Sequence, residues 1–266
     1  MSPPPPEPGV ADLVVFGGGH LGGTVARQVA AQGKRVLVLS PTPRPHAGLW
    51  RAWEAKSPAP VPLRGAHVLL ALSPRRKADA ADLWGVTVPM LASAAWREGA
   101  AAVTVCGPAG AGEAGIDTFV RGIAQLSGAP RTTVVRFGPL VGVDDGCLWP
   151  IVTSLRERGV VRLPRGLPPM WPLLLDDAAR AVTRLRGAGG EHVLRGPEQL
   201  RTEDLATLVT QRFGGRWAWR WWGGTGDLPR LRAWENLEDA WDDARLGPRQ
   251  TVAAWVGKLP GLRRRR

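Results

Sequence analysis

Tyrosine is missing from this sequence of 266 residues, so no phenol hydroxyl can donate a proton anywhere in the chain. The two cysteines, Cys106 and Cys147, give no disulfide framework, which suits a reducing compartment. The longest apolar runs, residues 66–72 and 100–106, are of strand length and too short to cross a membrane. Residues 1–10 are proline-rich without a hydrophobic stretch, so we expect a disordered lead and a cytoplasmic protein.

Lysine is also scarce, because it occurs only at positions 34, 56, 77 and 258 among 35 basic side chains. Arginine therefore carries most of the formal net charge of +12, and four arginines close the basic tail, residues 261–266. Abundant Arg, Ala, Gly and Pro are typical of GC-rich coding, and the usual nucleic-acid motifs are missing. We expect neither a nucleic acid nor a membrane as partner, and no metal, because no metal-ligand cluster is found. The charge can still steer phosphorylated ligands.

The first half of the chain alternates apolar strand patterns with helical patterns, as in a parallel sheet covered on both faces. The predicted strands are residues 12–16, 35–39, 66–72, 101–106 and 132–137. The predicted helices are residues 21–31, 86–97 and 116–126, and a proline-rich loop is expected over residues 40–62. This order predicts an α/β fold with a Rossmann-type doubly wound parallel sheet.

Beyond Gly138 the pattern is less regular, and it predicts helices at residues 148–158, 178–185, 202–212 and 251–258. A short strand is expected at residues 173–175, with Asp176 and Asp177 as the N-cap of the next helix. Residues 191–195 are expected to return to the main sheet. Trp217, Trp219 and Trp221 alternate, so in a strand they share one face, which favours a pocket or a lobe core. We therefore expect a Rossmann domain over residues 11–145 and a smaller C-terminal substrate lobe over residues 146–260.

A glycine motif lies directly after the first predicted strand. Gly17, Gly19 and Gly22 fit the pattern G-x-G-x-x-G, with His20 and Leu21 in its variable positions. Gly17 allows a tight turn, Gly19 allows a diphosphate to approach the backbone, and Gly22 allows close helix packing. The helix start then offers N–H groups and a positive dipole end to the phosphates. The motif predicts a bound dinucleotide; the alternative is a tight turn without a ligand.

The end of the second strand decides between the two nicotinamide dinucleotides. An acidic residue there would bind the adenosine ribose of NAD. This chain instead has Ser40, followed by Thr42 and Arg44, and hydroxyls with an arginine suit a 2′-phosphate. We therefore predict NADP, with NAD as the alternative and a solvated Arg44 as the competing interpretation. Ala71 and Leu72, at the end of the third strand, are predicted to complete the cofactor site.

Several segments in order resemble the extended or atypical short-chain dehydrogenase/reductase superfamily, the NAD-dependent epimerase/dehydratase-like group. VVFGGGHLGGTVARQVAAQGKRVLVLSP resembles its cofactor-binding start, and LRGAHVLLALSP resembles its third-strand segment. TTVVRFGPLVG, LLLDDAARAV and HVLRGPEQLRTEDLATLV are similar to later elements, so the likeness covers most of residues 12–213. The resemblance implies a Rossmann fold, a nicotinamide cofactor and oxidoreductase or epimerase chemistry.

The chain departs from this family at its catalytic pair, a tyrosine and a lysine in a Tyr-x-x-x-Lys motif. The two positions fall near Ala114 and Thr118, and no lysine lies between residues 77 and 258. Cys106 stands about where the family has a serine; it is a candidate thiol or a small buried hydrophobe. Two carboxylates, Glu113 and Asp117, are alternative acids or plain loop and helix-start charges. The catalytic residues are therefore unknown.

Three functions remain open at this point. The first is an NAD(P)-binding oxidoreductase or epimerase relative with a nonstandard or lost proton donor, acting on an unknown small molecule. The second is a non-catalytic NADP sensor that resembles NmrA-like regulators and contacts a macromolecule. The third is an assembly subunit that keeps only the fold and acts through a protein partner.

Overall fold

A computed structural model describes most of the chain, and it divides into two compact units. The described residues are 11–43, 48–54, 57, 62–73, 82–108, 132–142, 149–163, 169–219 and 250–259. The first unit comprises residues 1–107, 114–136 and 179–192, and the second comprises residues 108–113, 137–178 and 193–266. Segments of the two units therefore alternate along the chain, whereas the sequence predicts a single boundary near residue 145. The predicted lead and the basic tail lie outside the described residues.

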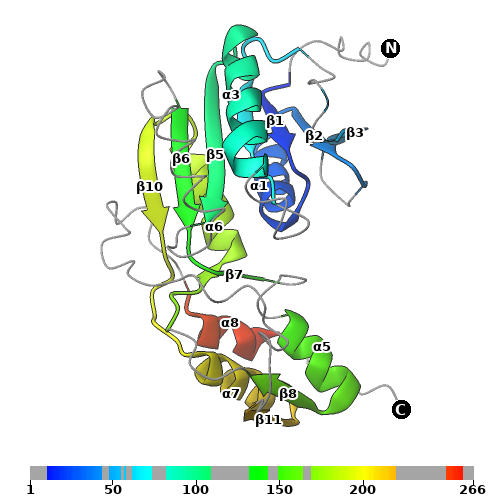
Figure 1. Cartoon of the computed structure of the whole chain (residues 1–266), viewed down its shortest axis with the longest axis vertical. Coiled ribbons are helices and arrows are strands. Elements are labelled where there is room, and N and C mark those ends of the chain that lie inside the picture. The colour runs from blue at the N-terminus through cyan, green and yellow to red at the C-terminus, as the bar shows by residue number, and fades with distance from the viewer. Residues whose placement is uncertain are drawn as a thin grey trace. The chain divides into compact units, whose positions relative to one another are not determined.

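The main sheet has seven parallel strands in the order β10-β6-β5-β4-β1-β2-β3 (Figure 1). Their bounds are β1 Leu13–Phe16, β2 Val36–Ser40, β3 Leu49–Ala52, β4 His67–Leu70, β5 Ala102–Pro108, β6 Thr132–Phe137 and β10 Gly190–Leu194. Strand order reverses between β1 and β4, because the chain returns to the other side of β1 after β3. The predicted Rossmann-type sheet is confirmed, and the segment over residues 191–195 does return to it as β10.

The central strands are apolar because both faces of the sheet are covered. All four residues of β1 are buried, as are three of the four in β4. The helices associated with this sheet are α1 His20–Ala30, the π-helix η2 Leu83–Thr87, α3 Val88–Arg97 and α6 Leu175–Leu185. Leu91, Ala92 and Ala95 of α3 pack in one core cluster with Val68 of β4 and Val103 of β5.

Strand β3 is a correction to the predicted loop over residues 40–62. It pairs in parallel with β2, and all four of its residues are exposed at the edge of the sheet. An edge strand with no buried face has no apolar alternation, so the hydrophobic pattern could not reveal it. The predicted helix over residues 116–126 lies outside the described residues.

The second unit contains short elements around its own core. They are β7 Leu140–Val141, α5 Trp149–Arg158, β8 Val160–Leu163, β9 Leu173–Leu174, α7 Thr202–Phe213, β11 Arg216–Trp219 and α8 Val252–Lys258. Strands β11 and β8 pair in parallel, as do β7 and β9. The buried core unites Ile151 of α5, Val209 of α7 and Val252 of α8. Trp217 packs against this core, which agrees with its predicted lobe-core role, while Trp221 lies outside the described residues.

One predicted helix start differs from the structure. Asp176 and Asp177 are not an N-cap, because α6 already begins at Leu175 and takes both into its first turn. The start predicted at residue 202 is confirmed: Thr202 is the first residue of α7, and Arg201 holds the N-cap position, where its N–H donates to Asp204 Oδ2 at 2.8 Å. In the part of the chain that the structure describes, no helix has the length and apolarity needed to span a bilayer.

Candidate dinucleotide site

The turn from β1 into α1 passes directly over the end of β4. Gly17 has a φ of +101°, a conformation that side-chain-bearing residues rarely adopt. A Cβ at Gly17 would lie 2.4 Å from the carbonyl oxygen of Ala71. The Gly17 N–H donates to Leu39 O at 2.9 Å, which ties the turn to β2 as well. Gly17 is therefore required by the fold itself, at the point where strand order reverses.

Gly22 is also required by packing. A Cβ there would lie 2.0 Å from Gly17 O and 3.1 Å from Val15 Cγ1. Any side chain would push α1 away from β1 and the turn. The role predicted for this glycine, close contact between helix and strand, is the geometry that the structure has.

Gly19 differs from both. It is exposed, and its φ of −65° and ψ of −167° are open to any residue. A Cβ at Gly19 would meet no described atom within 4 Å. Neither backbone conformation nor packing thus requires glycine at this position. The surface that a side chain would cover is left open, as the close approach of a ligand requires.

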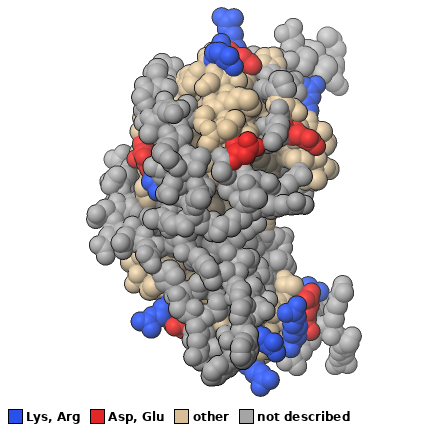
Figure 2. Space-filling view, in the orientation of Figure 1, with Lys and Arg blue, Asp and Glu red and all other residues tan. Residues whose placement is uncertain are grey.

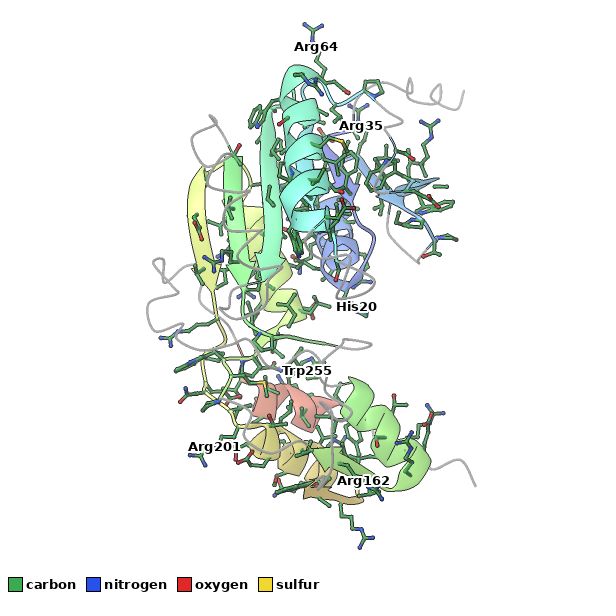
Figure 3. All side chains as sticks on the ribbon, in the orientation of Figure 1. His20, Arg35, Arg64, Arg162, Arg201 and Trp255 are labelled. Carbon is green, nitrogen blue, oxygen red and sulfur yellow. The ribbon has the colours of Figure 1, made fainter. Side chains whose placement is uncertain are left out.

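Among the described residues, the start of α1 carries no side-chain cap at its N-cap residue, Gly19, and no carboxylate in its first turn. Leu21 and Gly22 precede Gly23, whose N–H donates to Gly19 O at 2.8 Å as the first bond of the helix. This end of α1 combines donors with a positive dipole end, which suits an anion. Figure 3 labels His20, half-buried, at this end of the helix.

Ser40 lies at the end of β2, next to the glycine turn. Its side chain is buried, and its hydroxyl donates to Thr42 O at 2.8 Å. The same oxygen accepts a hydrogen bond from the indole Nε1 of Trp50, on β3, at 3.0 Å. Thr42 is exposed, and Arg44 lies outside the described residues. The sequence did not indicate Trp50, because finding it requires the register of the unpredicted strand β3.

Ala71 and Leu72 follow β4 at the same end of the sheet. The Ala71 N–H donates to Phe16 O at 2.9 Å, so this amide continues the pairing of β4 with β1. Its carbonyl oxygen is the atom that a Cβ at Gly17 would meet. The structure thus brings together five predicted positions on three chain segments: Gly17, Gly19, Ser40, Ala71 and Leu72.

Cys106 is poorly suited to catalysis. Strand β5 continues to Pro108, so Cys106 lies inside the strand and not at its carboxyl end. The side chain is buried, and burial raises the pKa of its thiol far above its usual range. A thiol that stays protonated is a poor nucleophile and base, which favours the interpretation as a small buried hydrophobe. The two candidate acids, Glu113 and Asp117, lie outside the described residues, as do Cys147 and the positions of the missing catalytic pair, Ala114 and Thr118.

The charged groups elsewhere do not form an alternative site among the residues that the structure covers. No group of His, Cys, Asp and Glu in this part of the chain is arranged to hold a metal ion. On the face drawn in Figure 2, the described basic side chains are scattered and several lie beside acidic ones. At the edge of the sheet where β1 begins, Arg35 N donates to Asp12 Oδ2 at 2.8 Å, and Figure 3 labels Arg35 there.

The fold is that of NAD-dependent epimerases and short-chain dehydrogenase/reductase proteins. No known family model and no curated protein matches the sequence. A solved structure of MoeE5 in complex with UDP-glucose and NAD aligns with a TM-score of 0.73 at 16% identity, covering 92% of this chain and 96% of that one. A UDP-galactose 4-epimerase aligns with a TM-score of 0.69 at 18% identity over 92% and 96% of the two chains.

A third structure is a short-chain dehydrogenase/reductase superfamily protein from Agrobacterium tumefaciens with bound NAD. It aligns with a TM-score of 0.61 at 15% identity, over 80% of this chain and 86% of that chain. At these identities the likeness establishes the fold alone. Chemistry has to be argued from the residues of the site.

Proposed function

We propose that this protein binds a nicotinamide dinucleotide, with its diphosphate at the start of α1. The observation that carries the proposal is Gly19, a glycine that neither conformation nor described packing requires and whose missing side chain leaves the helix start open. The helix start beside it, which no side chain of the described residues caps, would supply backbone donors to a diphosphate. Structural neighbours with NAD bound support the same class of ligand.

Different segments of the chain would bind different parts of the cofactor. The backbone from Gly19 to Gly22 would hold the diphosphate, and Ser40, at the end of β2, would contact the adenosine ribose. When bound, such a cofactor accepts or donates hydride. The accompanying proton cannot come from a tyrosine, because the chain has none, and the buried Cys106 thiol is held neutral. We therefore propose an oxidoreductase or epimerase relative with a nonstandard or lost proton donor.

A second candidate function is favoured by the missing tyrosine and by the absence of lysine between residues 77 and 258. A protein that binds the cofactor without turnover would act as a redox sensor or as an assembly subunit, through a protein partner. Turnover separates the two functions. Oxidation of NADPH or NADH in a screen of carbonyl and sugar-nucleotide substrates supports the enzyme, and tight binding without turnover supports the sensor. The cytoplasmic location remains a prediction.

The preference for NADP over NAD also remains a prediction. It rests on Thr42, Ser40 and Arg44, and the structure does not describe the arginine. Replacing Arg44 by alanine should weaken NADPH binding more than NADH binding if its guanidinium pairs with a 2′-phosphate. Equal weakening of both, measured by cofactor fluorescence, would reject that assignment.

The proposed cofactor site is tested by Gly19→Ala. A methyl group at this position should weaken NADH and NADPH binding by roughly 10- to 100-fold, because it occupies the space that the diphosphate needs. Stability should fall by less than about 1 kcal/mol, since the backbone conformation accepts alanine. Cofactor fluorescence and urea unfolding give the two measurements.

Gly257→Ala is the matched control. Gly257 also has open space around a hypothetical Cβ and no positive φ, but it lies in α8. This variant should bind both nucleotides as the natural protein does. Undiminished binding by Gly19→Ala, or no heat of binding with either nucleotide in calorimetry of the natural protein, would overturn the proposed function.

A further inference from the structure

The Ser40 hydroxyl has two hydrogen-bond partners whose chemical roles are fixed. Its Oγ lies 2.8 Å from the carbonyl oxygen of Thr42 and 3.0 Å from the indole Nε1 of Trp50. A carbonyl oxygen can only accept and an indole N–H can only donate. Ser40 must therefore give its single hydrogen to Thr42 and receive one from Trp50. No rotation of the hydroxyl satisfies both partners in any other way.

One lone pair is all that remains on this oxygen. In this arrangement Ser40 can accept a further hydrogen bond but cannot donate one. Ser40 follows Leu39, whose carbonyl binds the Gly17 N–H at 2.9 Å, so the hydroxyl lies beside the glycine turn. It stands at the carboxyl end of β2, where the ribose of a dinucleotide is recognised.

Trp50 is held in place by the register of the edge strand. Its Cα is paired with that of Val38, two residues before Ser40, so the Trp50 and Ser40 side chains project from the same face of the sheet. Trp50 as a whole residue is 38% exposed, whereas Ser40 is 4% exposed. An indole from the exposed edge strand thus fixes the hydrogen-bonding direction of a buried hydroxyl.

We infer that Trp50 is a specificity-determining residue, which orients the Ser40 hydroxyl as an acceptor for the unphosphorylated adenosine ribose of NAD. A ribose 2′-hydroxyl can donate to the free lone pair. A 2′-phosphate dianion has no hydrogen to donate and would face that lone pair with its own negative oxygens. This inference rests on the proposed dinucleotide site. Any preference for NADP then has to come from Thr42 and Arg44, against the effect of Ser40.

The first test is Ser40→Ala, with dissociation constants for NADH and NADPH measured side by side by fluorescence. We expect NADH to bind about 2- to 10-fold more weakly, the range that one neutral hydrogen bond contributes. NADPH should bind as before or more tightly. The inference is overturned if NADPH binding weakens as much as NADH binding or more, because a donating Ser40 would give that result.

The second test is Trp50→Phe, which keeps an aromatic ring and removes only the indole N–H. A hydroxyl that accepts a hydrogen bond also donates more strongly. Without the Trp50 N–H, the hydrogen bond from Ser40 to Thr42 O is therefore weaker, and the hydroxyl is free to donate elsewhere. The ratio of the NADPH to the NADH dissociation constant should fall by roughly 2- to 5-fold. A ratio is informative because a purely structural defect would weaken both nucleotides equally.

Trp96→Phe is the matched control for this change. Its Nε1 also donates to a hydroxyl, Thr132 Oγ1 at 3.2 Å, but that threonine begins β6, at the amino end of the sheet. Trp96→Phe should leave the ratio unchanged, and a Trp50→Phe variant that behaves the same way overturns the role of Trp50. Failure of the natural protein to bind either nucleotide would instead overturn the proposed function.

Discussion

Helices α1 and α8 begin in opposite ways. At the start of α8, Thr251 Oγ1 accepts from Ala254 N at 3.1 Å, and Glu198 Oε1 accepts from Val252 N at 2.7 Å. At the start of α1, the described residues offer neither a side-chain cap nor a first-turn carboxylate. The chain therefore caps the start of α8 with its own side-chain oxygens and, among the described residues, places no such oxygen at the start of α1. This difference is the one that the proposed diphosphate site depends on.

The largest effect is expected when α1 receives an oxygen-bearing side chain at its N-cap, as α8 has. Gly19→Asp places a carboxylate at the N-cap, so stability should hold or rise by up to about 1 kcal/mol. Nucleotide binding should weaken by at least about 100-fold, because the carboxylate repels the diphosphate and its side chain fills the open space. Calorimetry with NADH and urea unfolding measure the two effects.

The matched variant is Gly19→Asn, which caps a helix as well as aspartate does but carries no charge. It should retain more binding than Gly19→Asp, and the difference isolates the electrostatic part. If the aspartate variant binds NADH like the natural protein, the start of α1 is not the diphosphate site.

A moderate effect is expected at α8. Glu198→Ala removes the carboxylate that accepts from Val252 N and, at 3.4 Å, from Ala253 N. The free energy of unfolding should fall by about 1 kcal/mol, because the backbone N–H groups of Val252 and Ala253 lose their acceptor. Glu198→Gln keeps a neutral oxygen at the same place and should lose less. Unchanged unfolding of the alanine variant would show that Thr251 alone caps this helix.

The smallest expected effect is on the pH dependence of stability. It concerns His67 at the start of β4, the end of the sheet away from the glycine turn. Burial, aided by Arg186 and opposed by Asp12, lowers the pKa of His67 below its usual 6.5. The unfolded chain then binds the proton more readily, so this contribution to stability is present above pH 6.5 and is lost as pH falls toward the folded pKa. His67→Gln should flatten the fall in melting temperature between about pH 7 and pH 5. An unchanged profile would assign acid sensitivity to other groups.

The sequence predicts the glycine-rich start of the fold well. It places β1, α1 and β2 within one residue of their observed bounds, because apolar runs are separated by glycine-rich turns. The identity of the open glycine could also be predicted, since the motif assigns a different role to each of its three glycines.

The surroundings of Ser40 could not be predicted. The hydrogen bond from Trp50 depends on β3, whose four residues are all exposed and give no hydrophobic period. The sequence favours a buried Cys106 over a reactive thiol, and the structure confirms the burial, but the predicted strand ends two residues before the observed end of β5 at Pro108. The hydrophobic pattern thus predicts strands that have a buried face. Contacts made by an exposed edge strand can be found only once its pairing register is known.

The glycine turn is positioned by main-chain atoms alone. The bare Cα of Gly22 lies against Gly17 O, and that of Gly17 lies against Ala71 O, so three backbone segments are stacked without an intervening side chain. Exchanging one core residue for another of different volume therefore displaces this stack less than it displaces the helices. Such a layout tolerates extensive sequence change in the interior, which is consistent with a fold shared with a known structure at only 16% identity.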